Sequence, residues 1–340
     1  MPAWAIPQGT SNIGPKVILC DSYQVISRWS VLKHRFLGLC YSVVHNLKAM
    51  DNHPSLKRYL HFLGSTLTII GVLFVALRLR DYGNDFSIGD FNTTTWSGII
   101  IFILIYGFAN LMLTLAWWNL LMKFGIHTSR TWAIRTYGMT QLAKYAPGNI
   151  FHFAGKQAIG MAAGIPGWSL AKASIVELTL LTLAGAVFSI LNLPRILPLI
   201  SMTWAIYLFI CIGCVITLSI LRYGGPCLVR AFAWQCGFLT VSGFIFSGLF
   251  YLLLDNGSSL PWIHLCGAYI LAWLAGMVTP GAPAGVGVRE LVLLFVLKGL
   301  IPEADLLLAI VLGRVISVTG DLGFFGFTSF LKAETANKVQ

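Results

Sequence analysis

The chain has 340 residues, of which 57% are hydrophobic and 10% are charged, and its mean hydropathy is +0.78. This composition excludes an ordinary soluble globular protein and predicts an all-α polytopic membrane protein. The formal net charge is +11, but most of the basic residues flank apolar segments. The charge therefore indicates membrane topology and contact with lipid, and no nucleic-acid partner is expected.

Residues 1–58 form a basic segment with no apolar run long enough to cross a membrane. They contain seven Lys and Arg residues against only Asp21 and Asp51, which predicts that this end is cytoplasmic. Residues 28–50 mix basic and apolar side chains and are compatible with an amphipathic segment lying along an anionic membrane surface. The alternative is that Met50 is the true start and that the residues before it are an upstream extension. No signal peptide is recognisable at the N-terminus.

Residues 59–330 are predicted to form the transmembrane domain, followed by a polar tail at 331–340. A helix needs roughly 20 apolar residues to cross hydrocarbon, and seven segments are long enough to be candidates. These segments are 60–78, 98–122, 168–193, 197–220, 230–254, 262–279 and 303–330. The acidic loop 79–97 and the cations after the second segment agree with a cytoplasmic N-terminus. The predicted location is the cytoplasmic (inner) membrane.

Residues 131–166 fit neither a lipid-facing helix nor an ordinary loop. They carry three cations, yet they are too apolar for a surface connection, and Pro147-Gly148 splits them into two short halves. We expect a re-entrant hairpin that enters the membrane and turns back, either buried in protein or lining a wet cavity.

A second interruption of the same kind occurs at residues 279–291, "TPGAPAGVGVREL". In both interruptions a Pro-Gly pair is followed, nine positions after the proline, by a cation and a polar residue, and the offset between the two is 133 throughout. Beyond them, Pro166 and Pro302 each start a long apolar helix with a charge near its middle. The spacing predicts an internal repeat with elements at about 131–193 and 268–330. The predicted structural breaks are Pro147, Gly148, Pro280, Gly281, Gly285 and Gly287.

The relative orientation of the two repeats depends on how many helices cross between the hairpins. If residues 168–193, 197–220, 230–254 and 262–279 all cross, four crossings place both hairpins on the same side of the membrane. An inverted pair needs an odd number of crossings, so one of these segments would then not cross. Internal repeats with broken helices are a recurrent plan of transporters, and both orientations remain open at this point.

The helix breaks are the predicted binding site for an anionic group. The amides that start a half-helix are partly positive, and a lipid phosphate is the natural ligand. The candidate substrate-binding residues are Lys144, Asn149, Lys156, Arg289 and Glu290. As counterparts in the two repeats, Lys156 and Arg289 are predicted to converge on one head group. Gly285 and Gly287 would let a ligand approach the backbone closely, or would instead serve tight helix packing.

Charges inside membrane helices are costly unless they are paired or hydrated, so Glu177, Arg314 and Asp321 are predicted to be paired or functional. Arg314, Ser317 and Asp321 recur at helical spacing and should form one polar stripe. A pairing of Glu177 with Arg314 across the two repeats is a hypothesis, either as a static ion pair or as part of a gate. No hydrolase, ATPase or metal-ligand motif is recognisable, so no catalytic residue, metal or cofactor is predicted.

The stretches "QLAKYAPGNIFHFAGKQ" and "PGAPAGVGVRELVLL", with an arginine-bearing final helix, resemble the transmembrane region of lysylphosphatidylglycerol synthases and their stand-alone relatives. The resemblance covers roughly residues 60–330, and the inserted "APA" is a local departure from the family's pattern. It implies a polytopic lipid flippase fold with two re-entrant elements and a phospholipid or polyprenyl-phosphate-linked substrate. The matching positions are Lys144, Pro147, Gly148, Arg289 and Glu290. The synthases carry a soluble catalytic domain after this region, so aminoacylation of lipid by this chain alone is not expected.

These observations predict a lipid flippase that moves an anionic phospholipid or a polyprenyl-phosphate-linked glycolipid between leaflets. Its expected partners are membrane lipids with phosphate head groups. Two alternatives remain. One is a membrane-embedded transferase that uses Glu177 or Glu290 as a base. The other is an accessory subunit that anchors a glycosyltransferase or another cell-envelope enzyme.

Overall fold

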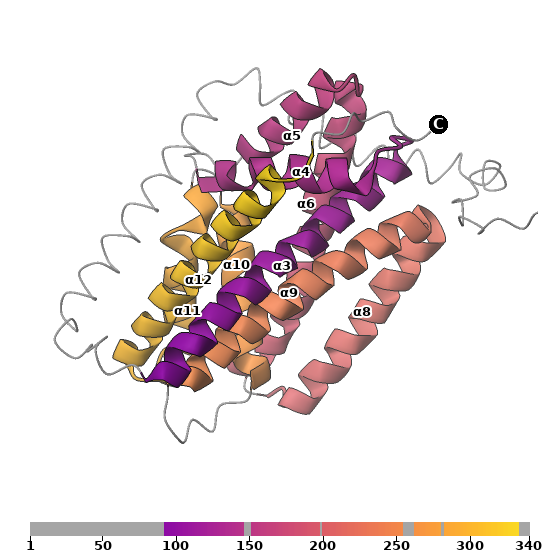
Figure 1. Ribbon diagram of the computed structural model, residues 1–340. Helices are drawn as coiled ribbons and strands as arrows, with labels where there is room; N and C mark the ends of the chain where they lie inside the picture. The colour runs from indigo at the N-terminus through magenta and orange to yellow at the C-terminus, as the bar shows by residue number, and fades with distance from the viewer. Residues whose placement is uncertain (1–91, 146–150, 198, 254–261, 280–281, 333–340) are drawn as a thin grey trace, which may run out of the picture. The chain divides into compact units, whose positions relative to one another are not determined.

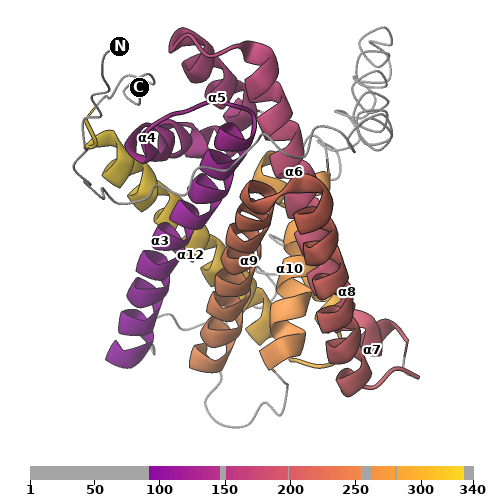
Figure 2. The same ribbon diagram turned by 90° about the vertical axis from the view of Figure 1, so that its right-hand side faces the viewer.

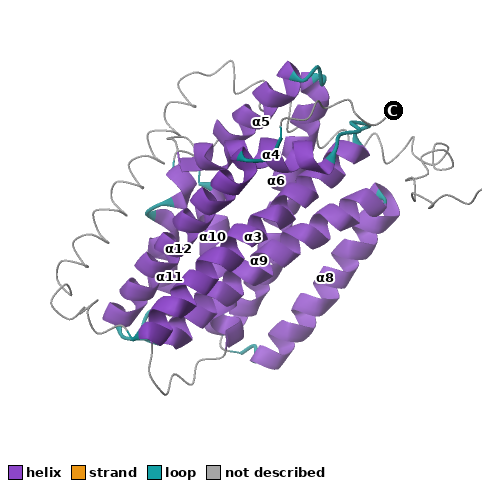
Figure 3. Cartoon of the chain, in the orientation of Figure 1, coloured by secondary structure: helices purple, strands orange, loops and turns teal. Residues whose placement is uncertain are grey.

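The computed structural model describes residues 92–145, 151–197, 199–253, 262–279 and 282–332, and all of them belong to one compact unit that runs from His53 to Gln340. Within these residues the only non-helical pairing is an isolated bridge between Lys298 and Ile301, and no strand is formed. The described part of the chain is therefore all-α, as the composition predicts (Figure 3).

The helices follow one another along the chain with short connections (Figure 1). They are α3 (Thr93–Lys123), α4 (Arg130–Gln141), η2 (Leu142–Tyr145), α5 (Phe151–Ala162), α6 (Gly167–Ser189), η3 (Ile190–Asn192), α7 (Leu193–Ile196), α8 (Met202–Gly224), α9 (Pro226–Leu253), α10 (Trp262–Val278), η4 (Pro283–Gly285), α11 (Val288–Leu297) and α12 (Glu303–Ser329).

Five of the described helices are long and apolar enough to cross a membrane, which makes this a multi-pass helical membrane protein. They are Thr93–Lys123, Gly167–Ile196, Met202–Gly224, Pro226–Leu253 and Glu303–Ser329. Six of the seven predicted segments fall on described helices, and the segment at 60–78 lies outside the described residues. The prediction at 197–220 began too early, because the chain turns before α8 and Ser201 caps that helix by accepting a hydrogen bond from the Trp204 amide.

The two prolines that were predicted to start long helices do so. Pro166 precedes α6 and Pro302 precedes α12, each with a φ near the value that the proline ring imposes (−58° and −53°). Glycines with positive φ end the preceding elements, at Gly164 (82°) and Gly299 (75°). Local backbone chemistry therefore marks these boundaries in the sequence.

Helices α3 and α9 form the central antiparallel pair of this unit. Gly98 near the start of α3 lies against Leu252 near the end of α9, and Gly237 of α9 lies against Met112 of α3. Figure 2 shows the two helices side by side, with α10 and α8 beyond α9. Because α9 runs opposite to α3, the elements that follow these two helices start from opposite ends of the unit.

Helix α10 is shorter than the five long apolar helices. It has 17 residues, and after the break it packs along α11, whose ten residues run back toward the start of α12. Only α6, α8 and α9 among the long apolar helices lie between the two breaks. The predicted segment at 262–279 therefore falls on a shorter apolar helix than the other predicted segments between the breaks.

Close glycine contacts position the polar interior. Gly107 of α3 packs against the backbone of Gly320 on α12, so these two helices approach closely. Asn110, one turn further along α3, consequently reaches Asp321 on α12. Helix α8 contributes little to this interior, because Ala205 is its only buried residue, and most of its apolar surface faces outward, as suits contact with lipid.

Candidate functional site

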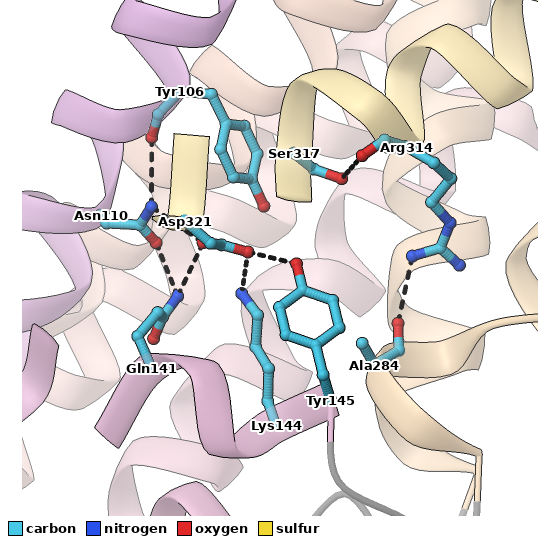
Figure 4. Close-up of polar contacts among 9 residues, drawn as sticks. All are labelled: Tyr106, Asn110, Gln141, Lys144, Tyr145, Ala284, Arg314, Ser317 and Asp321. Atoms are coloured by element: carbon cyan, nitrogen blue, oxygen red, sulfur yellow. Dashed lines mark hydrogen bonds and ion pairs between the residues drawn. The ribbon is translucent and has the colours of Figure 1, made fainter. Parts of the chain in front are cut away.

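Asp321 is the centre of a buried hydrogen-bonded cluster that joins three parts of the chain. Its carboxylate, fully buried on α12, accepts hydrogen bonds from Asn110 Nδ2 of α3 and Gln141 Nε2 of α4, both at 3.1 Å. The Tyr145 hydroxyl donates at 2.5 Å and Lys144 Nζ lies at 2.7 Å, both from η2. Figure 4 shows Lys144 and Tyr145 pointing toward Asp321 from the same side. The end of α4 and the η2 turn are thus attached to α12.

The amide side chains of this cluster also satisfy one another. Gln141 Nε2 donates to Asn110 Oδ1 at 2.8 Å, and Asn110 Nδ2 donates to the Tyr106 carbonyl at 3.3 Å. Buried polar groups that are fully paired hold their neighbours in one arrangement. The cluster therefore fixes the position of α4 relative to α3 and α12.

Arg314 lies two turns before Asp321 on the same helix. It contacts the second break, the interruption at residues 279–291. Its Nε lies 2.5 Å from Glu290 Oε1, and one terminal nitrogen donates to the Gly285 carbonyl at 3.1 Å. The other terminal nitrogen donates to the Ala284 carbonyl at 3.2 Å (Figure 4). These carbonyls belong to residues in the left-handed region, with φ of 48° and 70°. The guanidinium therefore satisfies backbone acceptors that an uninterrupted helix would have used itself.

Arg289 differs from the other central cations because no carboxylate pairs with it among the described residues. Its buried Nε has no hydrogen-bond partner there, and its guanidinium lies 5.4 Å from the centre of the Trp273 ring. The stem of the side chain passes over Gly276. A buried donor without a partner costs about 1–3 kcal/mol, so this geometry favours an incoming acceptor.

A small cavity of about 20 Å³ lies beside Arg289. It is lined by Phe246, Tyr269, Arg289, Glu290, Leu293, Ile310, Gly313, Arg314 and Ser317. Two guanidinium groups thus face one carboxylate, and Glu290 Oε2 has no partner among the described residues. The cavity holds about one water molecule in this conformation, and its lining carries excess positive charge.

Lys144 lies close to the residues of the second break. The η2 turn that carries it contacts η4, the side chain of Arg289 packs against Gly285 of η4, and Arg314 donates to the Gly285 carbonyl. Lys144, Arg289 and Arg314 are therefore grouped near η4, where Asp321 and Glu290 supply the two opposing carboxylates.

Lys156 belongs to a different ion pair, with Glu177. Its Nζ is 2.6 Å from Glu177 Oε2, and its side chain is 1% exposed. Tyr137 donates its hydroxyl to the other carboxylate oxygen of Glu177 at 3.2 Å. The hypothesis that Glu177 pairs with Arg314 is consequently wrong, because Glu177 pairs with Lys156 and Arg314 pairs with Glu290. The convergence of Lys156 and Arg289 on one head group stays a prediction.

The remaining predicted residues divide into three groups. Asn149 and the breaks at 147–148 and 280–281 lie outside the described residues. Gly285 and Gly287 have positive φ as expected of a break, but Gly285 packs against the backbone of Gly276, which supports the alternative of tight packing. The predicted polar stripe of α12 is confirmed, because Ser317 and Asp321 are buried and Arg314 reaches the second break.

Sequence reasoning did not identify Asn110, Gln141 and Tyr145 as part of the site. Asn110 lies in the middle of a 31-residue apolar helix, and a polar residue at such a place is a signal that could have been used. Gln141 and Tyr145 flank Lys144 within "QLAKY". Only the folded arrangement shows that all three share the carboxylate of Asp321.

The fold and the site together define a multi-pass α-helical membrane protein with a buried, positively charged site between two helix breaks. Comparison with protein-family models and with curated proteins finds no match.

Proposed function

We propose that this protein is a lipid flippase that moves a lipid with an anionic phosphate head group, either a phospholipid or a polyprenyl-phosphate-linked glycolipid, between the two leaflets. The observation that carries this proposal is Arg289, a cation at a helix break with a buried donor and no paired carboxylate among the described residues. Arg314 lines the same cavity and Lys144 is close by. A guanidinium binds phosphate oxygens through two parallel hydrogen bonds, which suits a phosphate rather than a neutral ligand.

The element order supports a transporter built from two inverted repeats. Each repeat has a long helix, a short helix, a break, a second short helix and another long helix: α3, α4, α5 and α6 in the first, and α9, α10, α11 and α12 in the second. The first helices of the two repeats are antiparallel, and three long helices lie between the breaks. Inverted repeats with discontinuous helices that meet near the membrane midplane are a common plan for moving a ligand between two sides.

Helix α12 connects the two hairpins and gives the proposed mechanism. Arg314 fastens the second break through Ala284 and Gly285, and Asp321 fastens the first through Lys144 and Tyr145. Release of one attachment at a time opens the site toward one leaflet while the other hairpin stays closed. A phosphate that binds Arg289 also attracts Lys144 and Arg314. Because its negative charge replaces that of Asp321 or Glu290 as their partner, it promotes release of the attachment.

The distribution of basic residues supports an orientation for this mechanism. Lys123 and Arg222 lie in the last turns of α3 and α8, and Lys172 and Arg230 lie in the early turns of α6 and α9, which gathers them at one end of the long helices. Cations concentrate on the cytoplasmic side of membrane proteins. The first hairpin then opens to the cytoplasm and the second opens outward.

Transport by reconstituted protein tests the proposal. We expect fluorescent lipids with phosphate head groups to cross vesicles containing the protein faster than empty vesicles, and Arg289→Gln to lose at least tenfold in rate. Arg222→Gln, which neutralises an exposed arginine outside the site, is the matched control and should retain the rate. If no head group crosses faster than in empty vesicles, the flippase proposal is wrong.

The second candidate is a membrane-embedded transferase, and one observation favours Glu290 over Glu177 as its base. Both oxygens of Glu177 are engaged, by Tyr137 and Lys156, whereas Glu290 Oε2 has no partner among the described residues and lines the cavity. Purified protein incubated with a labelled lipid distinguishes the two functions. A flippase leaves the mass of the lipid unchanged, and a transferase alters it. If instead Arg289→Gln has no effect on function in cells, the accessory-subunit alternative gains support.

A further inference from the structure

Lys156 lies inside a cage of aromatic rings that is separate from the cavity at Arg289. Its Nζ is 4.5 Å from the centre of the Tyr137 ring, 4.8 Å from that of Phe153 and 5.4 Å from that of Trp117. Glu177 completes the cage with a carboxylate oxygen at 2.6 Å. A carboxylate surrounded by aromatic faces is the arrangement with which proteins bind organic ammonium ions.

The fixed walls of the cage come from three helices that pack closely together. Trp117 belongs to α3, Tyr137 to α4 and Glu177 to α6. Trp117 stacks on Trp132 with ring centres 6.0 Å apart, and Gln235 of α9 donates a hydrogen bond to the backbone carbonyl of Glu177 at 3.0 Å. These contacts outside the cage hold Trp117 and Glu177 in position. The walls do not depend on the lysine for their positions.

The lysine itself comes from α5, a separate 12-residue helix of the first hairpin. This helix packs against α4, α6 and η2, and it has no extensive contact with the α3, α9 and α12 group. Phe153, the fourth member of the cage, is carried by the same helix. A displacement of α5 therefore removes the lysine and one ring together, and leaves Trp117, Tyr137 and Glu177 as an open ammonium site.

A second feature of the walls points to a ligand. Trp117 is 1% exposed, and its indole Nε1 is buried without a hydrogen-bond partner among the described residues. Lys156 has only donors and cannot satisfy it. A ligand that carries an acceptor oxygen close to its ammonium group, as an amino alcohol does, can satisfy Glu177 and Trp117 at the same time.

We propose that Trp117, Tyr137 and Glu177 form a binding site for a primary alkylammonium group, and that Lys156 occupies this site as a tethered substitute in the present conformation. The ligand displaces the lysine when α5 moves away. The ammonium belongs either to a lipid head group or to a free amine. If it belongs to the lipid, the proposal rests on the proposed flippase function and adds an ammonium to the transported head group.

Replacement of the lysine by a small residue tests the site directly. Lys156→Ala removes three carbons and the ammonium, the same atoms that n-propylammonium supplies. We expect millimolar n-propylammonium to raise the melting temperature of purified Lys156→Ala by several degrees, and neutral 1-propanol to have no such effect. Wild-type protein, whose site is occupied, should not respond, and neither should Lys156→Ala combined with Glu177→Gln. An equal response to 1-propanol, or no response to the amine, overturns the proposal.

A measurement on variants that keep the lysine covers the case in which Lys156→Ala does not fold. In vesicles, a fluorescent ethanolamine phospholipid should cross faster than its N-acetylated analogue with wild-type protein, and Trp117→Leu should abolish the difference. Alternatively, the two lipids cross equally fast, and free ethanolamine inhibits transport by wild-type protein but not by Trp117→Leu. This result assigns the site to a free amine. If transport does not depend on the amine and free ethanolamine does not inhibit it, the proposal is wrong. If no lipid crosses but n-propylammonium stabilises Lys156→Ala, the flippase function fails and the ammonium site stands.

Discussion

Asp321 has no exposed surface and lies in the interior of an otherwise apolar helix, where an ionised carboxylate is tolerated only with partners. The four side chains that reach it come from three elements. The cost of burying the charge is offset by an ammonium, a phenol and two amides. The same contacts attach η2 to α12, so Asp321 contributes both to stability and to the position of η2.

Neutralising this carboxylate should be strongly destabilising. Asp321→Asn removes the partner of Lys144 and leaves a largely buried ammonium unpaired, and we expect a loss of about 3 kcal/mol in the free energy of unfolding. Denaturant titration in detergent measures it. Asp305→Asn, the same substitution in the first turn of α12, is the control and should cost less than about 1 kcal/mol. Similar losses at both positions would contradict the assigned role of Asp321.

The assignment of ion pairs is testable with double-mutant cycles. Glu290 with Arg314, and Lys156 with Glu177, are direct pairs and should show coupling energies of about 1–3 kcal/mol in unfolding experiments. Glu177 with Arg314, the pairing that sequence reasoning favoured, should show a coupling close to zero. A large coupling between Glu177 and Arg314 would mean that a different arrangement dominates in solution.

At the scale of the elements, the polar cluster depends on how closely α3 and α12 approach. A Cβ atom added at Gly320 would lie 2.9 Å from a ring carbon of Tyr106 and 3.1 Å from the backbone nitrogen of Gly107. Small residues of this kind let membrane helices pack backbone to backbone, and the approach brings Asn110 to Asp321. The hydrogen-bonded cluster and the helix packing therefore support each other.

A larger residue at Gly320 should separate these helices and disrupt the cluster. We expect Gly320→Leu to cost about 1–3 kcal/mol of stability and to reduce lipid transport, because side chains forced into a packed interface displace the backbone. Gly323→Leu is the control, since a Cβ at Gly323 meets nothing within 4 Å. Thermal unfolding and the vesicle assay measure the two effects. Equal behaviour of both variants would show that the close contact is not important.

At the scale of the whole described unit, the proposed inverted repeat places Ala162 and Leu300 at opposite ends of the long helices. Ala162 ends α5, and Leu300 follows α11. Three long helices lie between these two positions along the chain. In an inverted pair, residues at these two positions face opposite sides of the membrane.

Side-specific labelling tests this topology. In a variant without native cysteines, Ala162→Cys should react with a membrane-impermeant thiol reagent from the cytoplasmic side, and Leu300→Cys from the outer side. Vesicles of known orientation and a permeant reagent provide the controls for access and expression. Labelling of both positions from the same side would exclude the inverted arrangement.

Much of the fold was predictable from the sequence because membrane helices are specified locally. Long apolar runs, and Pro166 and Pro302 as helix starts, act over a few neighbouring residues. The predicted segment at 262–279 coincides with α10, which is shorter than the other apolar helices, and only the folded structure shows that it packs along α11.

The sequence by itself determined that this is an α-helical membrane protein, where its longer described helices begin and end to within about five residues, and that Glu177, Arg314 and Asp321 need partners. Only the tertiary structure decided which partners these are: Lys156 for Glu177, Glu290 for Arg314, and the Lys144 cluster for Asp321. The physical reason is that a buried charge requires a partner wherever it lies, whereas the choice of partner depends on helix directions and glycine contacts between residues far apart in the chain.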